Sequence, residues 1–133
     1  MKKVISVLFL TLMLGLTQAA FAQGQDQVTL RAGQQKWAAN GRLKIKFISV
    51  TEDSRCPVNV ECVWAGNAKV KIQLVVPGGD SGIFEFNTNT GTKANQADAY
   101  RVELVSLTPG RRSNKKIRQR DYRVTISVIK LSR

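Results

Sequence analysis

The chain has 133 residues, no histidine and a formal net charge of +12, with 21 lysine and arginine residues against nine acids. The lack of histidine removes the commonest general base and the usual serine and cysteine triads, so the composition argues against an enzyme. It also argues against zinc or copper, because two cysteines without histidine make a poor ligand set. We therefore expect no metal and no cofactor.

The first residues have the organisation of a secretory signal peptide. A basic start, Met1-Lys2-Lys3, precedes an apolar run over residues 4–17, and Ala20 and Ala22 occupy the small positions of an A-x-A cleavage site. The apolar run is too short for a good membrane span, and no later stretch predicts one. We expect residues 1–22 to be removed after Ala22 and the protein to be exported to the periplasm or the extracellular space.

Removal of the signal peptide leaves all but two of the basic residues, so the net charge stays at about +10. The remaining length fits a single domain. Residues 23–27 are polar and are expected to be disordered, so the domain should cover residues 28–133. The charge favours an anionic partner such as a glycan, a lipid headgroup or an acidic protein. The alternative interpretation is that the charge only keeps the protein in solution.

Apolar and polar residues alternate with period two after residue 27, which predicts half-buried antiparallel strands. In chain order, the alternating segments are residues 27–32, 43–50, 67–76, 82–86, 100–107 and 121–131. Turn residues such as Asn40-Gly41 and Pro109-Gly110 separate them. The side chains expected to face the core are Val28, Leu30, Ala32, Leu43, Ile45, Phe47, Ala68, Val70, Ile72, Leu74, Tyr100, Val102, Leu104, Tyr122, Val124, Ile126 and Val128.

Six or seven short strands in roughly 105 residues, with no helical periodicity, predict an all-β fold. We expect a small antiparallel β-sandwich, loosely immunoglobulin-like, with a small β-barrel as the alternative. The inter-sheet disulfide of a true immunoglobulin domain is absent, because the two cysteines are only six positions apart. Residues 87–99 are polar and predict a long loop.

The segment EDSRCPVNVECVWAGNA, residues 52–68, holds both cysteines. In an exported protein Cys56 and Cys62 are expected to form a disulfide. Redox centres of the thioredoxin type use C-x-x-C at a helix start, whereas here five residues separate the cysteines in a strand context, which favours a structural cross-link. Nearby Glu52, Asp53 and Glu61 match no calcium-binding loop.

Other residues of this segment are predicted to be structural. Pro57 stiffens the loop, and Gly66 lies where the chain turns towards the next strand. Trp64 follows Cys62 by two positions and would share its side of a continuing strand, so we expect it to be a core residue packed beside the disulfide. Asp53 and Arg55 are expected to bond to each other or to the loop backbone.

The same segment resembles part of a group of exported bacterial proteins. Residues 53–68 follow the pattern D-S-R-C-P-x-x-V-x-C-V-W-A-G-x-A, and a looser likeness covers LVSLTPG at 104–110 and Asp121-Tyr122. The resemblance implies a shared domain and a bacterial setting. It carries no activity.

The densest charge run is GRRSNKKIRQRDYR, residues 110–123, in which Asp121 is the only acid. Its cations are Arg111, Arg112, Lys115, Lys116, Arg118, Arg120 and Arg123. The stretch NKKIRQ also fits an x-B-B-x-B-x spacing proposed for heparin-like polyanions, so these residues are candidates for polyanion binding. The alternative is a solvated hairpin loop. No aromatic residue interleaves the cations, which argues against specific nucleic-acid binding.

These observations favour a non-catalytic binding module for an anionic envelope component or polyanion. Lys44, Lys46, Lys69 and Lys71, on the exposed sides of two strands, are possible contributors, and if those strands are neighbours the like charges would crowd one face. The alternative function is protein–protein interaction, such as inhibition of an exported or foreign hydrolase. NTNTG at residues 87–91 resembles the N-P-T-T-G loop of chagasin-like protease inhibitors, although it lacks the proline.

Overall fold

A computed structural model describes residues 24–132 of the chain. The predicted signal peptide and its cleavage site lie outside these residues. No helix within them has the length and apolar character needed to cross a membrane.

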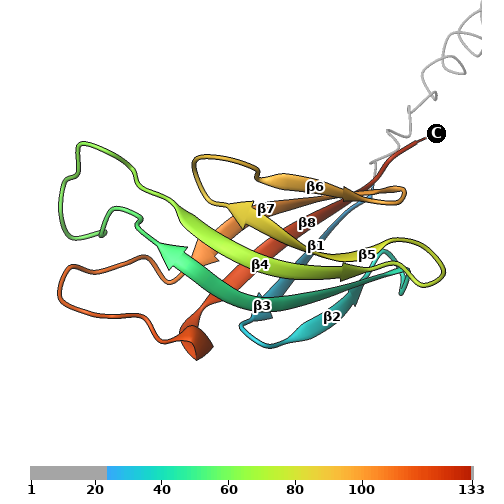
Figure 1. The fold of residues 1–133 in the computed structure, drawn as a ribbon, viewed down its shortest axis with the longest axis horizontal. Coiled ribbons are helices and arrows are strands. Elements are labelled where there is room, and N and C mark those ends of the chain that lie inside the picture. Colours follow the sequence, from blue (N-terminus) through green and yellow to red (C-terminus); the bar gives the residue numbers. More distant parts are fainter. Residues whose placement is uncertain (1–23, 133) are drawn as a thin grey trace, which may run out of the picture.

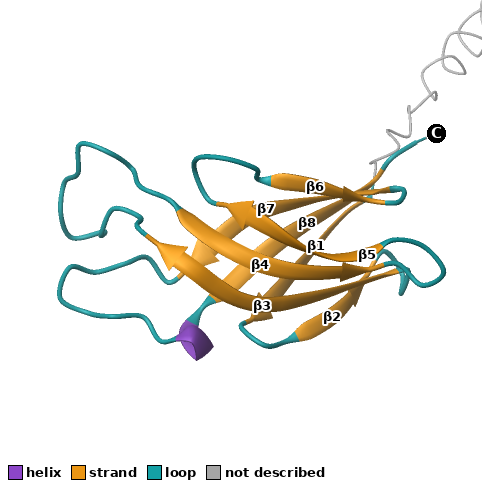
Figure 2. Cartoon of the chain, in the orientation of Figure 1, coloured by secondary structure: helices purple, strands orange, loops and turns teal. Residues whose placement is uncertain are grey.

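The described residues form eight strands in two four-stranded antiparallel sheets that pack face to face (Figures 1 and 2). The first sheet has the order β1-β8-β7-β6, with the bounds Gln25–Arg31, Arg123–Lys130, Tyr100–Thr108 and Ala94–Ala97. The second has the order β2-β3-β4-β5, with the bounds Gln35–Ala38, Leu43–Asp53, Ala68–Val75 and Ser81–Asn87. A short 3-10 turn, η1, covers Gln119–Asp121. The predicted β-sandwich is therefore confirmed, and the sheets do not close into the alternative barrel.

Strands that follow one another in the chain are neighbours within each sheet, apart from β1. The chain passes from one sheet to the other after β1 and after β5, and β1 pairs along its whole length with the last strand, β8. These connections are meanders rather than the Greek-key crossings of immunoglobulin domains, so the likeness to that fold lies in the packing of two antiparallel sheets. The start of β1 and the end of β8 lie at one end of the sandwich, and two long loops project from the other (Figure 1).

Three segments differ from the prediction. The strands β2 and β6 have only four residues each, too few to show an alternating pattern, and β6 lies within the stretch 87–99 that was expected to be a loop. Residues 25–27 are not disordered but begin β1, where Gln25 is opposite Ile129 of β8. Their polar character misled the prediction because an edge strand can be held by its backbone ladder without burying every side chain.

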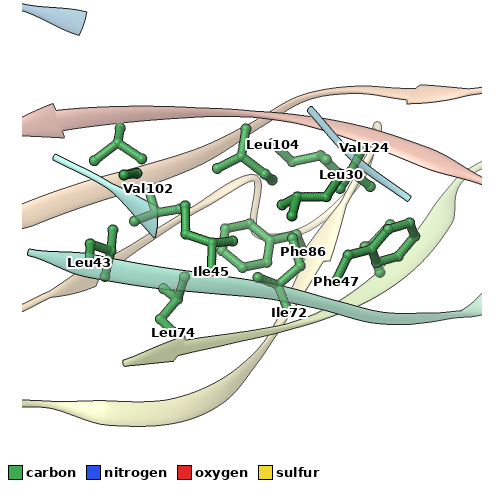
Figure 3. Close-up of a cluster of buried hydrophobic side chains, with 14 of the residues drawn as sticks. Leu30, Leu43, Ile45, Phe47, Ile72, Leu74, Phe86, Val102, Leu104 and Val124 are labelled. Carbon is green, nitrogen blue, oxygen red and sulfur yellow. The ribbon is translucent and has the colours of Figure 1, made fainter. Parts of the chain in front are cut away.

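The core fills the space between the sheets, as Figure 3 shows for Leu30, Phe47, Phe86 and their neighbours. Every side chain predicted to face the core is buried except Val28 and Ala32, which are half-buried against it. Period-two alternation therefore identified the buried face of each long strand. It did so because one face of each sheet is in contact with the other sheet and the opposite face is in contact with water.

Bulges in β3 and β7 change which residues of these strands face inwards. The register shifts twice in β3, between Phe47 and Ser49 and between Val50 and Glu52, and once in β7, after Leu104. A bulge adds one residue to its strand and so reverses the alternation beyond it. As a result Val50 and Leu107 are buried, whereas Val105 is 51% exposed.

The lysines of β3 and β4 do not crowd one another, although the two strands are neighbours. Lys69 is opposite Glu52 and its Nζ lies 3.4 Å from the Glu52 carboxylate. Lys71 has Ser49 on one side and Glu85 on the other. The partners of the remaining two are uncharged: Lys44 is opposite Trp37 and Val75, and Lys46 is opposite Gln35 and Gln73. The register thus separates the charges, and this face does not form a concentrated cationic site.

The orientation of β5 gives a direct test of the sandwich. Phe86 is fully buried, whereas Ile83 on the same strand is 61% exposed. Replacing Phe86 by alanine should lower the free energy of unfolding by about 3–5 kcal/mol, because it opens a cavity between the sheets. Ile83→Ala is the control and should cost less than about 1 kcal/mol. Urea denaturation of both variants checks this, and equal losses would contradict the assignment of faces.

Candidate binding surface at the loop end of the sandwich

Two loops project from the end of the sandwich opposite the start of β1 and the end of β8 (Figure 1). The disulfide loop, residues 54–67, joins β3 to β4, and the basic loop, residues 109–118, leaves β7 and leads to η1 before β8. Each loop connects two strands of the same sheet, and the two loops belong to different sheets. Contacts between the loops therefore link the two layers of the sandwich.

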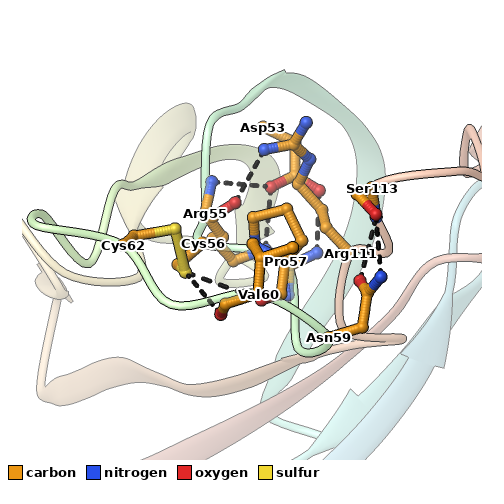
Figure 4. The surroundings of a disulfide bond; sticks show 9 residues. All are labelled: Asp53, Arg55, Cys56, Pro57, Asn59, Val60, Cys62, Arg111 and Ser113. Carbon is orange, nitrogen blue, oxygen red and sulfur yellow. Dashed lines mark hydrogen bonds and ion pairs between the residues drawn. A yellow bond between two sulfur atoms is a disulfide. The ribbon is translucent and has the colours of Figure 1, made fainter.

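Asp53 and Arg55 form a two-pronged ion pair at the base of the disulfide loop (Figure 4). The Arg55 Nε donates to Asp53 Oδ1 at 2.8 Å, and the Arg55 Nη2 donates to Asp53 Oδ2 at 2.7 Å. The Arg55 side chain is only 15% exposed and the Asp53 side chain only 9%. The expectation that these two residues bond to each other is confirmed.

Arg55 also reaches across to the other sheet. Its Nη1 donates to the Leu107 carbonyl at 2.8 Å, and its Nη2 donates to the Pro109 carbonyl at 2.9 Å. The planar guanidinium thus links the end of β3 to the end of β7 while remaining paired with its carboxylate. Lysine has no such fixed fork of donors and could not make the same set of contacts.

Tyr122 completes the network from the start of β8. Its hydroxyl donates to Asp53 Oδ2 at 2.9 Å. Burial raises the pKa of Asp53, but the hydrogen bonds from Arg55 and Tyr122 and the charge of Arg55 outweigh it, so this pKa lies below its usual value. Burial, together with the hydrogen bond to Asp53 and its negative charge, raises the pKa of Tyr122 to about 12. The site therefore holds an ionised carboxylate and a neutral phenol at neutral pH.

The disulfide loop and the basic loop are hydrogen-bonded to each other (Figure 4). The Arg111 Nη1 donates to the Arg55 carbonyl at 2.7 Å, and the Val58 N–H donates to the Arg111 carbonyl at 2.8 Å. Further out, Asn59 Nδ2 donates to Ser113 Oγ at 2.7 Å, and the Ser113 N–H donates to Asn59 Oδ1 at 3.0 Å. The loops consequently form one surface rather than two independent flaps.

Gln119 fastens the far end of the basic loop to β3. Its Oε1 accepts from the Val50 N–H at 3.0 Å, and its Nε2 donates to the Val50 carbonyl at 2.7 Å. The amide side chain thus pairs with both backbone groups of Val50 in the bulged part of β3. A buried bulge would otherwise leave these groups without partners.

The base of the disulfide loop closes at Gly66 and Asn67. Gly66 has a φ of +68°, and a Cβ at this position would overlap the backbone carbonyl of Ser54. The Asn67 Nδ2 donates to Asn87 Oδ1 at 2.8 Å, and its Oδ1 accepts from the Asn89 N–H at 3.0 Å. Gly66 is thus required both by its positive φ and by the close approach of the Ser54 carbonyl. Asn67 connects a third loop, residues 88–93, to the same end of the sandwich.

Cys56 and Cys62 form the predicted disulfide, with their Cα atoms 5.9 Å apart. Pro57 lies within the ring that the bond closes, and the Cys56 N–H donates to the Ala65 carbonyl at 2.9 Å. In the chain-entropy description, closing a ring of this length removes about 2.4 kcal/mol of unfolded-state entropy. Cys62 is exposed, so the disulfide braces a loop and is not part of the core.

The prediction that Trp64 is a core residue is wrong, since its side chain is 81% exposed. That prediction assumed that a strand continues beyond Cys62, whereas the chain stays irregular until β4 begins at Ala68. Val63 is 91% exposed, Val58 65% and Val60 43%. The outer part of the disulfide loop therefore presents apolar side chains to the solvent.

The seven cations predicted to bind polyanions do not form one cluster. Arg111 lines the same groove as Arg112, but its Nη1 donates to the Arg55 carbonyl. Arg118 makes a two-pronged ion pair with Asp121, with Nε 2.7 Å from Oδ2. Arg120 and Arg123 lie around a different hollow, which Arg31 and Pro109 also line. The structure brings together Arg112, Lys115 and Lys116.

These three residues line an open groove of about 580 Å³ between the basic loop and the end of β3. Two acids, Glu52 and Asp53, also line the groove, but Glu52 pairs with Lys69 and Asp53 with Arg55. Arg112, Lys115 and Lys116 make no ion pair with any residue between 24 and 132. The groove thus has an excess of positive charge that the described part of the molecule does not neutralise.

The NTNTG stretch does not form a freely presented inhibitor loop. Asn87 is only 8% exposed, its N–H donates to the Thr92 carbonyl at 2.7 Å, and its side chain bonds to Asn67. The asparagine that matches the first position of the N-P-T-T-G loop is therefore part of the packing, whereas Asn89 later in the stretch is exposed.

Comparison of the chain with models of protein families, with curated proteins and with solved structures found no match. The surface must therefore be interpreted from its own chemistry. Two residues that sequence analysis did not single out, Asn67 and Gln119, fix its shape. Neither carries a distinctive signal, because their role depends on amide geometry with groups that are distant in the sequence.

The hydrogen bond between Tyr122 and Asp53 should make stability depend on alkaline pH. Tyr122→Phe removes a donor to the half-buried, charged Asp53 carboxylate and should lower the free energy of unfolding at pH 7 by about 1.5–3 kcal/mol. A raised pKa gives stability that is complete below the unfolded value near 10. It is lost as pH rises through about 12. The difference in free energy of unfolding between wild type and Tyr122→Phe should therefore become smaller from pH 10 to 12.

Denaturant titrations at several pH values measure that gap. Tyr100→Phe is the control at pH 7, because Tyr100 is equally buried and its hydroxyl makes no hydrogen bond to the described residues. Its cost should be clearly smaller. A gap for Tyr122→Phe that stayed constant up to pH 12 would argue against the hydrogen bond.

Gly66 should tolerate substitution far less than a glycine with the same backbone conformation in open space. Gly66→Ala combines left-handed strain with an overlap against a backbone carbonyl, and should cost at least about 3 kcal/mol. Gly78 has a similar φ of +74° but no atom within 4 Å of an added Cβ. Gly78→Ala should therefore cost only about 1–2 kcal/mol. Thermal unfolding compares the two, and equal costs would show that the overlap is relieved by a shift of the loop.

Proposed function

We propose that this protein is a non-catalytic binding module that holds an anionic envelope component or polyanion at the groove beside the basic loop. The observation that carries the proposal is the set of three converging cations, Arg112, Lys115 and Lys116, without an acidic partner in residues 24–132. Several cations directed at one groove attract a polymer of anions more strongly than the same charges dispersed over a surface.

The rigid attachment of the basic loop supports this function. Gln119 fixes one end of the loop to β3, and Ser113 fixes its tip to Asn59 of the disulfide loop. Binding therefore requires less ordering of the loop than a free arm would need, and this preorganisation favours affinity. The groove is open, which suits an extended polymer or a surface rather than an enclosed small molecule.

We further infer that the protein works outside the cytoplasm of a bacterial cell. The signal-peptide pattern of residues 1–22 and the resemblance of residues 53–68 to exported bacterial proteins support this location. The disulfide agrees with it, because such bonds persist in oxidising compartments. Anionic glycans and lipid headgroups are abundant partners of suitable charge in that setting.

Protein–protein interaction, such as inhibition of an exported or foreign hydrolase, is a second candidate. The exposed Trp64 favours it, because tryptophan is enriched among the residues that dominate protein interfaces. The groove does not require such a partner, however, since its excess charge is explained by any polyanion.

Retention on a heparin column tests the polyanion function. Arg112→Gln/Lys115→Gln/Lys116→Gln removes three cations from the groove, and Lys44→Gln/Lys46→Gln/Lys71→Gln removes three from the outer face of the second sheet. Both variants have the same net charge. The groove variant should elute at clearly lower salt, and the salt slope of its binding should decrease by about 2–3 in magnitude.

Equal elution of the two variants would show that net charge alone explains retention. Failure of the wild type to bind even at low salt would refute the polyanion function and favour the protein-binding alternative. Circular dichroism of both variants establishes that they remain folded.

A further inference from the structure

Exposed apolar side chains of the described residues are concentrated in the disulfide loop. Seven large hydrophobic side chains are exposed, and four of them, Val58, Val60, Val63 and Trp64, lie within seven consecutive residues. Such a concentration is uncommon on a surface that only contacts water. The sandwich buries its other large side chains efficiently, so this exposure is a local property of the loop.

The loop is built to keep these side chains away from the core. The disulfide closes the turn, and the Cys56 N–H bonds to the Ala65 carbonyl, so Val63 and Trp64 lie outside the bonded base. Gly66 and Asn67 fasten that base to Ser54 and to the neighbouring loop. The tip consequently projects beyond the ends of the strands (Figure 1).

The apolar tip and the cationic groove belong to the same end of the molecule. The Val58 N–H bonds to the Arg111 carbonyl, and Asn59 bonds twice to Ser113 in the turn that separates Arg112 from Lys115. The contacts between the loops therefore place the exposed Val58 directly beside Arg111, which lines the groove. The start of β1 and the end of β8 lie at the opposite end (Figure 1).

We propose that this end of the sandwich docks on an anionic lipid bilayer. Val63 and Trp64 enter the headgroup region, while Arg112, Lys115 and Lys116 contact lipid phosphates. The inference rests on the proposed polyanion function and specifies its partner. It combines the two signals that reversible membrane attachment requires, an apolar insertion and a polybasic patch.

The chemistry of the surface favours a bilayer over a protein partner. Tryptophan prefers the boundary between hydrocarbon and water, where its ring is in an apolar layer and its N–H stays hydrated. The tip is exposed on consecutive residues and projects outwards, which a deformable bilayer accommodates without a matching pocket. Charge complementarity selects anionic lipid, since the three groove cations have no acidic partner in the described residues.

Vesicle binding tests this proposal. Co-sedimentation with vesicles of phosphatidylglycerol and phosphatidylcholine should retain the wild type at low salt, and vesicles of phosphatidylcholine alone should not. Trp64→Ala should lower the partition coefficient by about tenfold or more, since a large ring no longer leaves water. The groove variant should show a comparable loss. Ile83→Ala removes an apolar side chain of β5 that is 61% exposed and outside both loops, and should leave binding unchanged.

Fluorescence reports the insertion directly. Trp37→Phe leaves Trp64 as the only tryptophan of the chain. Its emission should shift to shorter wavelength when anionic vesicles are added and should be quenched by bromine-labelled lipid. An unchanged emission in the presence of bound vesicles would overturn the insertion of Trp64, as would normal vesicle binding by Trp64→Ala.

Heparin retention separates the failure of this inference from that of the proposed function. Trp64→Ala should elute from heparin with the wild type, because its cations are intact. A wild type that binds heparin but not anionic vesicles would refute bilayer docking and leave the polyanion function standing. A wild type that binds neither would refute both. A Trp64 emission shift with a purified hydrolase and none with vesicles would replace the bilayer by a protein partner.

Discussion

The half-buried ion pair between Asp53 and Arg55 is the constraint on which the loop end depends. A carboxylate in this position is costly unless it is paired and hydrogen-bonded. Arg55 supplies the charge and Tyr122 a further donor, while the remaining donors of Arg55 bond to carbonyls at the end of β7. The guanidinium therefore ties the end of β3 to the end of β7, and the Asp53 carboxylate ties β3 to Tyr122 just before β8, so both loops start from a base of fixed geometry. Removing either charge would leave the other buried without compensation, which costs more than the pair itself contributes.

The same end of the molecule divides its cations into two groups with different roles. Arg55 and Arg118 are paired with the carboxylates of Asp53 and Asp121, and Arg111 is held by a hydrogen bond from its Nη1 to the Arg55 carbonyl. Arg112, Lys115 and Lys116 line the groove without an acidic partner among the described residues. This division explains why a stretch with seven cations leaves only three groove cations without an acidic partner in the described residues. The net charge of residues 110–123 is therefore larger than the positive charge that is available to bind a partner.

Sequence analysis predicted the long strands and their buried faces because the core imposes a period of two on every strand that packs against the other sheet. It missed β2 and β6, whose four residues are held by backbone pairing at the sheet edges and need no pattern. At the site it predicted the disulfide and the Asp53–Arg55 contact, which depend on residues close in the sequence. It placed Trp64 in the core, because spacing alone does not show whether a strand continues after Cys62. It could not separate the paired cations from the unpaired ones. The partner of Arg111 lies on the disulfide loop, and that of Arg118 lies in η1.

The exposure of Trp64 also gives the disulfide a more specific role than general stabilisation. An apolar side chain next to a flexible loop would gain free energy by folding back onto the protein surface, since this removes apolar area from water. The ring closed by Cys56 and Cys62, stiffened by Pro57, restricts the conformations that would allow such a collapse. The cross-link therefore acts on the loop rather than on the core, to which it contributes no buried side chain. We infer that it holds Val63 and Trp64 in a conformation that is unfavourable in water and favourable only against a partner.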